Sequence, residues 1–315
     1  MLWTVITEER GTRKRTEWKA NVVCHATGLF NRGKIPAIPG ASRFNGQAWH
    51  TADWPSHANL AGKRVAVIGT GPSAAQVIPS IQPIVKSMTI YQRSPSWCLP
   101  RDDYAYSPLQ RFVFKWIPFA HYLYCWWLGH TTSAVAFRAF RPASGVSSVM
   151  EAVGLKHLET QVKDPVLREK LRPSGRFGCK RPLFLDDYYP ALCQPNVELV
   201  TDPPIEITET GIVSKPVVQL TDAERNKIQS ERTKAHSTQV VIEGLGLENY
   251  KAISNTGERH TEVDVIIWGT GFVVQEWGTV YEIVGRGGMT LGEHWGTDYY
   301  TLYGIFPFLI WCNFY

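Results

Sequence analysis

The six cysteines of this 315-residue chain form no C-x-x-C pair. They lie far apart along the sequence, at Cys24, Cys98, Cys125, Cys179, Cys193 and Cys312. Zinc sites and disulfide frameworks normally show closely spaced cysteines, so neither kind of site is expected. The sequence instead indicates buried thiols in the reducing environment of the cytoplasm, without a metal site.

Three other kinds of segment are not expected. The first residues contain no basic region followed by an apolar one, so no signal peptide is predicted. No repeat of fixed period is present, which argues against a solenoid. The apolar stretch 112–128 includes Lys115, Pro118 and His121, whereas a membrane-spanning helix needs about 20 nearly uncharged residues. A buried or interfacial aromatic helix is expected there, which leaves peripheral membrane contact open.

Composition and charge indicate a folded globular chain. Apolar residues make up 44% of the sequence and charged residues 19%, as is typical of folded domains. The net charge of +5 comes from scattered basic residues, so no nucleic-acid partner is expected. Aromatic residues reach 12%, which favours large concave pockets or a membrane-facing surface. The length favours two domains.

Residues 63–91 carry the clearest structural signal. Arg64–Ile68 has the character of a buried strand, a glycine-rich turn follows it, and residues 74–81 have the character of a helix. Met88–Tyr91 is the next expected strand. A β-turn-α-β unit of this kind is typical of an α/β fold. The stretch 32–55, rich in Gly and Pro, indicates a linker.

The turn of this unit fits the dinucleotide-binding pattern G-x-G-x-x-A. Its residues, all candidate cofactor contacts, are Gly69, Thr70, Gly71, Pro72, Ser73 and Ala74. The first glycine makes the tight turn, the second lets the backbone approach a pyrophosphate, and the third small residue lets helix and strand pack closely. The pyrophosphate would lie on free N–H groups at the helix N-terminus. A glycine-rich turn without a ligand is the alternative.

The residues after the second strand select among dinucleotides. NAD and FAD sites place Asp or Glu there to bind the ribose hydroxyls, but this chain has Tyr91-Gln92-Arg93-Ser94 and no acid. The planar guanidinium of Arg93 suits a 2′-phosphate. NADP is therefore the predicted cofactor, with an ordinary surface arginine as the alternative.

A second pattern, F-x-G-x-x-x-H-x-x-x-W-P, ends shortly before the first strand of this unit. It is formed by Phe44, Gly46, His50, Trp54 and Pro55. With this fingerprint immediately upstream of the glycine turn, the chain resembles the class B flavin-dependent monooxygenases, and among them the Baeyer–Villiger type. The resemblance implies FAD and NADP as cofactors.

Three further segments resemble the family in the expected order. Ala26-Thr27-Gly28 is similar to the turn that leaves the FAD domain. Lys180-Arg181 is similar to a basic pair that precedes Asp186-Asp187-Tyr188-Tyr189. The stretch 263–272 resembles a second strand and its Ala-Thr-Gly turn, with Gly269 in place of the usual Ala.

The resemblance also implies roles for single residues. Arg93 and Lys180 would hold the 2′-phosphate of NADP. Arg181 would be the active-site arginine, whose fixed charge stabilises anions of the reaction. His50 would couple domain movement to cofactor turnover. Paired acid–base work by Asp186 and Asp187 is not expected, because adjacent side chains in an extended run point in opposite directions.

The implied architecture is α/β, with a Rossmann-like NADPH-binding domain and an incomplete FAD-binding domain. Residues 1–45 would be a remnant of the FAD domain and a linker. Residues 46–200 would form the NADPH domain, with a helical insertion at about 101–175. Residues 201–315 would return to a truncated FAD domain, with an extra segment at about 214–255 that includes a charged helix at 221–234. No second G-x-G-x-x-G precedes residue 69, so the chain resembles a shortened member of the family.

The predicted reaction uses NADPH, FAD and O₂ to insert one oxygen atom into a ketone, giving an ester or lactone. One alternative is oxygenation of nitrogen or sulfur compounds by a related flavin enzyme. The other is a non-catalytic NADPH-binding fragment. Lys180-Arg181 and the Trp54-Pro55 ending favour the ketone reaction over nitrogen or sulfur oxygenation.

Overall fold

The computed structural model describes residues 3–9, 11–24, 30, 32–101, 103–140, 145–219, 250–253, 257–273, 288–290, 293, 301–302 and 306–307. The predicted turn at 26–28 and helix at 221–234 lie outside these residues. The chain divides into two compact units, one of Met1–Arg32 with Phe272–Tyr315 and one of Gly33–Gly271. The chain passes between these two units at residues 32–33 and 271–272. The domain boundaries expected near residues 45 and 200 stay predictions.

The first unit contains a hairpin of β1 (Trp3–Glu8) and β2 (Arg15–Ala20), paired antiparallel from Trp3↔Ala20 to Glu8↔Arg15. Glu8 binds Arg13 at 3.1 Å and Arg15 at 2.8 Å, which closes the connection between the strands. The same unit holds the antiparallel pair β15 (Thr301–Leu302) and β16 (Phe306–Pro307).

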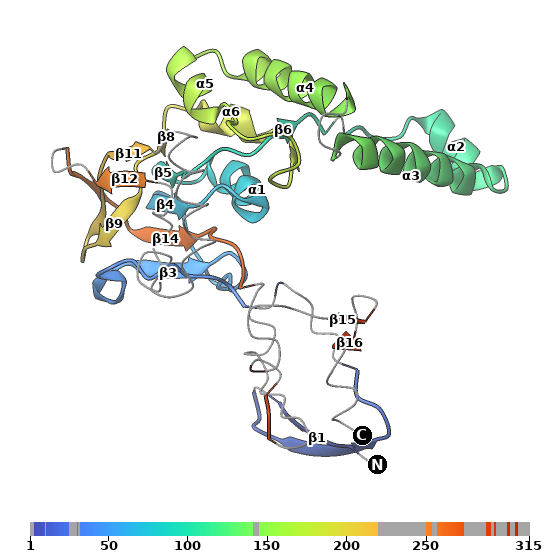
Figure 1. The fold of residues 1–315 in the computed structure, drawn as a ribbon, viewed down its shortest axis with the longest axis horizontal. Helices are drawn as coiled ribbons and strands as arrows, with labels where there is room; N and C mark the ends of the chain where they lie inside the picture. The colour runs from blue at the N-terminus through green and yellow to red at the C-terminus, as the bar shows by residue number, and fades with distance from the viewer. Residues whose placement is uncertain are drawn as a thin grey trace. The chain divides into compact units, whose positions relative to one another are not determined.

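The second unit is built on a five-stranded, fully parallel sheet (Figure 1). The strand order is β3 (Gln47–His50), β14 (Val265–Trp268), β4 (Arg64–Ile68), β5 (Ser87–Tyr91) and β8 (Val197–Val200). Helix α1 (Pro72–Ile81) connects β4 to β5. This arrangement confirms the predicted β-turn-α-β unit and the Rossmann-like α/β fold.

Both faces of this sheet are buried, which explains the uninterrupted apolar run of β4. Val65 and Val67 belong to the core that includes Ile78 of α1. Ala66 and Ile68 point to the opposite face, where a second core includes residues of another sheet. That sheet is antiparallel, in the order β13 (Arg259–Glu262), β10 (Gly211–Ser214) and β9 (Pro204–Ile207).

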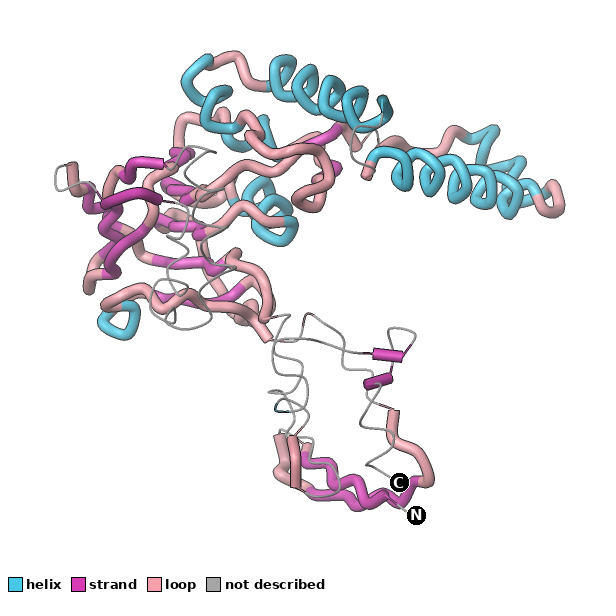
Figure 2. Tube along the Cα trace, viewed as in Figure 1, coloured by secondary structure: helices cyan, strands magenta, loops and turns pink. Residues whose placement is uncertain are grey.

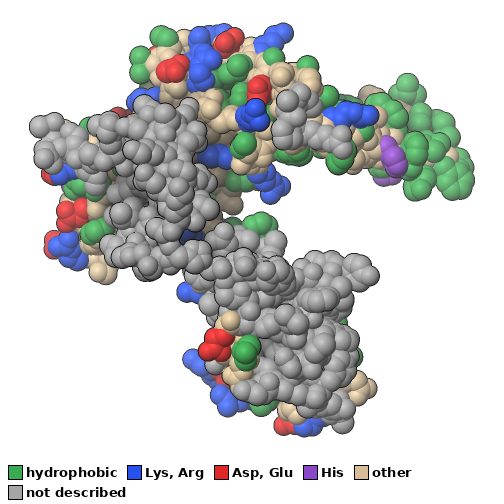
Figure 3. Space-filling model, viewed as in Figure 1, with side chains coloured by type: hydrophobic (Ala, Val, Ile, Leu, Met, Phe, Trp, Pro, Cys, Tyr) green, Lys and Arg blue, Asp and Glu red, His purple; other side chains and the backbone are tan. Residues whose placement is uncertain are grey.

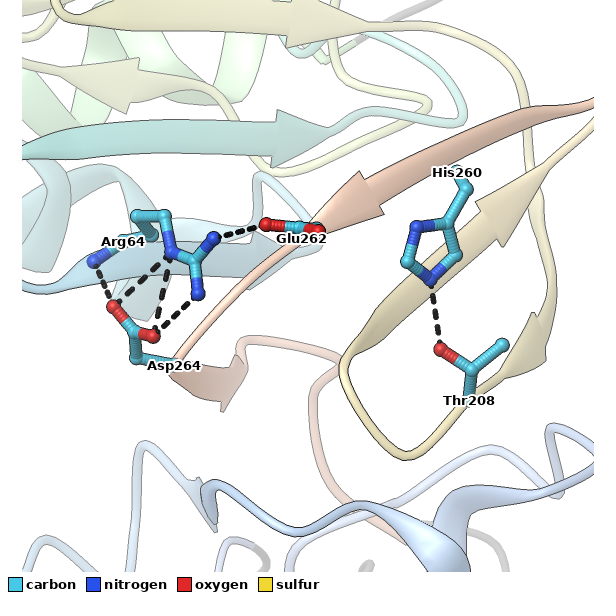
Figure 4. Close-up of polar contacts among 5 residues, drawn as sticks. All are labelled: Arg64, Thr208, His260, Glu262 and Asp264. Atoms are coloured by element: carbon cyan, nitrogen blue, oxygen red, sulfur yellow. Dashed lines mark hydrogen bonds and ion pairs between the residues drawn. The ribbon is translucent and has the colours of Figure 1, made fainter.

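Polar contacts also join the antiparallel sheet. The ring of His260 on β13 lies 2.8 Å from the hydroxyl of Thr208, next to the end of β9 (Figure 4). The two-stranded ladder of β11 (Val217–Gln219) and β12 (Tyr250–Ile253) pairs the two described ends of the segment predicted to be extra sequence.

The predicted helical insertion is present between β5 and β8 (Figure 2), but its elements continue to Leu192 instead of ending near residue 175. It contains β6 (Cys98–Leu99), α2 (Pro108–Trp116), α3 (Ala120–Ala139), α4 (Gly145–Gln161), α5 (Pro165–Leu171), β7 (Leu183–Phe184) and α6 (Tyr188–Leu192). Strands β6 and β7 pair in parallel, so the insertion leaves and rejoins the domain side by side. Helix α6 packs against α1.

The linker predicted at 32–55 is wrong in one part. After the 3-10 turn η1 (Ala41–Arg43), residues 47–50 form β3, an edge strand that pairs in parallel with β14 from Gln47↔Val265 to His50↔Trp268. Trp49 and His50 are buried by this pairing. A strand this short has too few residues to show an alternating pattern of its own.

One charged cluster fixes the starts of the central strands (Figure 4). The carboxylate of Asp264, just before β14, accepts hydrogen bonds from the backbone N–H of Arg64 at 2.8 Å and from its Nη2 at 2.8 Å. Arg64 also binds Glu262. In return, the backbone N–H of Asp264 donates to the carbonyl of Arg64 at 2.8 Å. Side chain and backbone together set the register between β14 and β4.

These hydrogen bonds lower the pKa of Asp264 from 3.8 to about 2, chiefly through the side chain and then the backbone N–H of Arg64. Asp264→Asn should therefore lower the free energy of unfolding by about 1–2 kcal/mol at neutral pH. Because the folded-state pKa is lowered, the stabilisation is complete above pH 3.8 and is lost as the pH falls toward 2.

Urea unfolding at several pH values checks this expectation. The difference between Asp264→Asn and the parent chain should shrink below about pH 4. Glu262→Gln is the matched control, because that carboxylate is more exposed and should contribute less. A difference that is as large at pH 2.5 as at neutral pH would contradict the assignment.

Candidate functional site

The glycine turn follows β4 at the carboxyl edge of the parallel sheet. Gly69 has φ +101°, a conformation that side-chain-bearing residues rarely adopt. A Cβ atom at this position would also overlap the carbonyl of Gly269, which follows β14. The backbone N–H of Gly69 donates to the carbonyl of Tyr91 at 2.9 Å. Two neighbouring strands thus hold the turn in place.

The next glycine leaves its surroundings open. A Cβ on Gly71 would meet nothing nearer than the carbonyl of Gly269 at 4.0 Å, so the backbone is accessible from outside. Helix α1 begins directly after Gly71 with Pro72 and has no side-chain cap. The N–H groups of Ser73 and Ala74 lie in its first turn, where helical residues have no intrahelical acceptor. This geometry suits a phosphate group.

Gly269 and Ala74 pack too closely for both residues to carry a side chain. A Cβ atom on Gly269 would lie 2.6 Å from the Cβ of Ala74, well inside van der Waals contact. Ala74 is completely buried. The absence of a side chain at Gly269 therefore makes room for the methyl group of Ala74 and allows the close approach of helix and strand.

A basic pocket lies beyond the end of the neighbouring strand β5. Its volume is about 460 Å³, and it is lined by residues 92–95, 97, 169–170, 172–176 and 179–180, with Thr201. Five of its residues are basic and one is acidic: Arg93, Lys170, Arg172, Arg176 and Lys180, against Glu169. Glu169 forms an ion pair with Arg172 at 3.3 Å. The pocket therefore favours an anionic ligand.

Lys180 and Arg93, predicted to act together, are brought together here. The ammonium group of Lys180 donates hydrogen bonds to the hydroxyl of Ser94 and, at 3.3 Å, to its carbonyl. Although Lys180 as a residue is exposed, burial of its ammonium group lowers its pKa, and the nearby charge of Arg93 lowers it further. An anion bound between the two cations would favour the charged form of Lys180 and raise its pKa again.

The opposite wall of the pocket was missed by the sequence prediction. Gln92 is buried and donates a hydrogen bond to the carbonyl of Lys170 at 2.9 Å. The indole N–H of Trp97 donates to the carbonyl of Gly175 at 2.8 Å. These two bonds hold the segment 170–176 against the residues that follow β5. The clustering of basic residues at 168–176 was the available signal, but their proximity to Arg93 depends on tertiary packing.

His50 lies at the end of β3 and is almost completely buried. Its Nδ1 accepts a hydrogen bond from the backbone N–H of Ala52 at 3.1 Å, so Nε2 is the donor toward the carbonyl of Gly271 at 2.8 Å. The same carbonyl accepts from the N–H of Lys34 at 2.8 Å. A Cβ on Gly33 would overlap the imidazole ring. His50 thus binds both ends of the second unit together, and its coupling role stays a prediction.

The other fingerprint residues support β3. Phe44 packs against the core on the antiparallel-sheet face, and a Cβ on Gly46 would overlap the carbonyl of Asp264. Trp54 contacts the buried Trp49 edge to face, with ring centroids 5.5 Å apart. Pro55 is exposed and accepts a hydrogen bond from the N–H of Ala58.

Arg181 differs from its neighbour Lys180. Its side chain is exposed and makes no hydrogen bond or ion pair with the residues that the structure describes. Its active-site role therefore stays a prediction. Asp186 and Asp187 are not in one extended run as expected: Asp186 accepts from the N–H of Arg101 at 2.9 Å, and Asp187 has helical backbone angles before α6. Within the described residues, no group of His, Cys, Asp and Glu could hold a metal ion. The expected burial of the thiols holds for Cys98 and is wrong for the exposed Cys24, Cys125, Cys179 and Cys193.

Sequence and structure comparisons identify relatives of this chain. Residues 2–117 match the family model described as flavin-binding monooxygenase-like. The "FAD-binding monooxygenase BOA2" of Botryotinia fuckeliana is 37% identical over 97% of this chain and 51% of that protein. A "Baeyer-Villiger monooxygenase" of Streptomyces coelicolor is 34% identical over 88% of this chain and 45% of that protein. The structure of cyclohexanone monooxygenase from Rhodococcus sp. Phi1 bound to NADP+ aligns with a TM-score of 0.66 at 25% identity, covering 95% of this chain and 55% of that one.

The fold and the glycine turn thus define a Rossmann-type nucleotide-binding protein. The chain belongs to the flavin-binding monooxygenases, and within them it is of the Baeyer–Villiger type. It spans about half the length of the curated relatives that it matches.

The pairing of Gly269 with Ala74 can be tested by exchange. Gly269→Ala should lower the free energy of unfolding by about 1–3 kcal/mol, because the added methyl overlaps that of Ala74. Ala74→Gly should cost about 1 kcal/mol in the helix. The double variant moves the methyl group from residue 74 to residue 269, so it should be more stable than the sum of the single effects allows. Urea unfolding of all four proteins measures this coupling, and simple additivity would contradict the packing argument.

Proposed function

We propose that this chain supplies the NADPH-binding part of a flavin-dependent monooxygenase. The enzyme would use NADPH, FAD and O₂ to insert one oxygen atom into a ketone, giving an ester or lactone. The observation that carries the proposal is the placement of the glycine turn and the basic pocket at the carboxyl ends of two adjacent parallel strands, β4 and β5. Dinucleotides bind at this edge in related folds.

The two parts of the site suit two parts of NADPH. The open backbone at Gly71 and the N–H groups of Ser73 and Ala74 would bind the pyrophosphate. Arg93 and Lys180 would neutralise the 2′-phosphate, which explains why the end of β5 carries no acid for a free ribose hydroxyl. The five basic residues around the pocket would strengthen binding through their field.

When bound, NADPH supplies a hydride and FAD supplies the oxygen chemistry, so the protein residues bind, orient and shield them. Arg181 would provide fixed positive charge where the reaction develops an anion. His50 would keep the carbonyl of Gly271 in place where the chain leaves the nucleotide-binding unit. Neither role requires these residues to transfer a proton.

The ketone class rests on the relatives. Solved structures of cyclohexanone monooxygenase are described as bound to cyclohexanone, with a TM-score of 0.61 at 25% identity, and to epsilon-caprolactone, a lactone. For this chain, the basic pair Lys180-Arg181 supports the same chemistry. We propose a small organic ketone as the substrate.

The coenzyme assignment is tested at Arg93. Arg93→Ala should weaken NADPH binding about tenfold to a hundredfold, because a charge-assisted interaction of about 1.5–3 kcal/mol is lost. NADH has no 2′-phosphate, so its affinity should change little. Arg43→Ala is the matched control, since Arg43 is an exposed arginine paired with Glu206 and does not line the pocket. Calorimetric titration with both coenzymes measures the effect, and equal losses would contradict the assignment.

The reaction is tested on the purified chain supplied with NADPH and FAD. Ketones should give esters or lactones, detected by mass spectrometry, while amines and sulfides should give little oxide. Dominant N-oxide or sulfoxide formation would favour the alternative oxygenation reaction. A protein that binds NADPH, shows no flavin absorption and yields no oxygenated product would instead support the non-catalytic alternative.

A further inference from the structure

The hairpin of α2 and α3, defined here as residues 104–140, carries an unusual excess of exposed apolar side chains. Its two helices pack against each other, and α3 also packs against α4. Figure 1 shows the hairpin projecting beyond the parallel sheet. In the space-filling view, hydrophobic side chains cover its free end (Figure 3). No part of the proposed coenzyme site lies on these two helices.

Part of the aromatic content of the hairpin holds the two helices together. The rings of Tyr106 and Phe114 are in edge-to-face contact, with centroids 5.3 Å apart, and each also contacts Tyr124 of α3. At the other end of α3, Ala139 is buried with Trp97 and Phe177. The hairpin therefore has a packed interior of its own, and its base is anchored in the core of the insertion.

A second set of large apolar side chains on the hairpin is mostly exposed. Phe119 is 76% exposed, Trp116 64% and Trp126 52%. Tyr122, Leu123 and Trp127 are also more than half exposed. These residues follow one another around the free end of the hairpin and the first turns of α3. Monomeric soluble proteins rarely expose contiguous apolar patches of more than a few hundred Å², so this surface calls for a covering partner.

The charges of this region indicate the partner. Residues 104–150 contain no Asp or Glu, but they contain Arg111, Lys115, Arg138 and Arg141. No charged residue occurs from Trp116 to Phe137. Arg111 and Lys115 lie on α2, which leads to the apolar free end. Trp and Tyr are favoured at the boundary between lipid chains and headgroups. Basic side chains beside them attract anionic headgroups.

The length of the element limits how it can meet a bilayer. Among the described helices, none is long and apolar enough to cross a membrane. Because α3 is exposed around nearly its whole circumference, several of its faces could contact lipid at once. Insertion of the hairpin end into one leaflet is compatible with both observations.

We propose that the α2–α3 hairpin docks this protein onto the surface of a membrane that contains anionic lipid. Trp116, Phe119 and Trp126 enter the interfacial layer with their neighbours, while Arg111 and Lys115 bind headgroups. The enzyme is thereby held at the surface where apolar compounds concentrate. This inference rests on the hairpin alone and does not depend on the reaction proposed above.

Sedimentation of the full 315-residue chain with vesicles tests the proposal. Binding should be strong to phosphatidylcholine mixed with phosphatidylserine, weak to phosphatidylcholine alone, and weakened by salt. The double variant Trp126→Ser/Trp127→Ser should partition at least about tenfold less, because two large apolar side chains no longer enter lipid. Arg111→Gln and Lys115→Gln should each reduce binding to the anionic vesicles about fivefold.

The matched control is Trp3→Ser/Trp18→Ser, which removes two exposed tryptophans from the β1–β2 hairpin. It should bind vesicles like the parent chain. Circular dichroism and NADPH titration establish that each variant is folded. Equal binding of the parent and Trp126→Ser/Trp127→Ser would overturn the proposal. So would a parent chain that ignores vesicles but forms a dimer lost in this variant, because a second copy would then cover the surface.

Discussion

The carbonyl group of Gly269 occupies the space that any side chain at Gly69 would need. This contact joins the end of β14 to the turn that follows β4. It requires glycine at residue 69, and the packing of Ala74 requires glycine at residue 269. Because Gly269 also leaves room for the Cβ of Ala74, helix α1 can begin directly above the sheet. The N–H groups in its first turn are therefore held at the carboxyl edge, where a pyrophosphate can reach them. Without this close approach, the basic pocket beside β5 would have no adjoining helix N-terminus suited to a phosphate group.

Strand β14 links this site to the places where the chain enters and leaves the nucleotide-binding unit. The start of β14 is fixed by the hydrogen bonds between Asp264 and Arg64. A few residues past the end of β14, the carbonyl of Gly271 accepts hydrogen bonds from the N–H of Lys34 and the ring of His50. The two chain crossings into the other unit follow at once, at residues 32–33 and 271–272. A change in strand position would thus reach the glycine turn and both crossings together. The buried His50 contacts the carbonyl of Gly271 beside the second of these crossings, a position compatible with the coupling role predicted for it.

Local sequence patterns predicted the elements that are formed by residues adjacent in the chain. The strand, turn and helix of 64–81 lie next to one another in the sequence, and so their order revealed the nucleotide fold. Strand β3 was misjudged because its partner β14 is far away along the chain and four residues carry little periodicity. The wall that contains Arg172 and Arg176 was missed for a related reason. Its place opposite Arg93 depends on hydrogen bonds from Gln92 and Trp97, which only the folded chain brings within reach.

The core of the helical insertion supports both the wall of the basic pocket and the α2–α3 hairpin. Trp97 donates to Gly175 in the pocket wall, and its ring lies against Gly154 of α4, where an added Cβ would be only 3.0 Å away. Helix α4 in turn packs against α3. The basic wall of the pocket and the aromatic hairpin are therefore parts of one continuous structure. The buried Trp97 therefore connects the polar pocket at one end of the insertion to the packed base of the helices that expose apolar surface at the other.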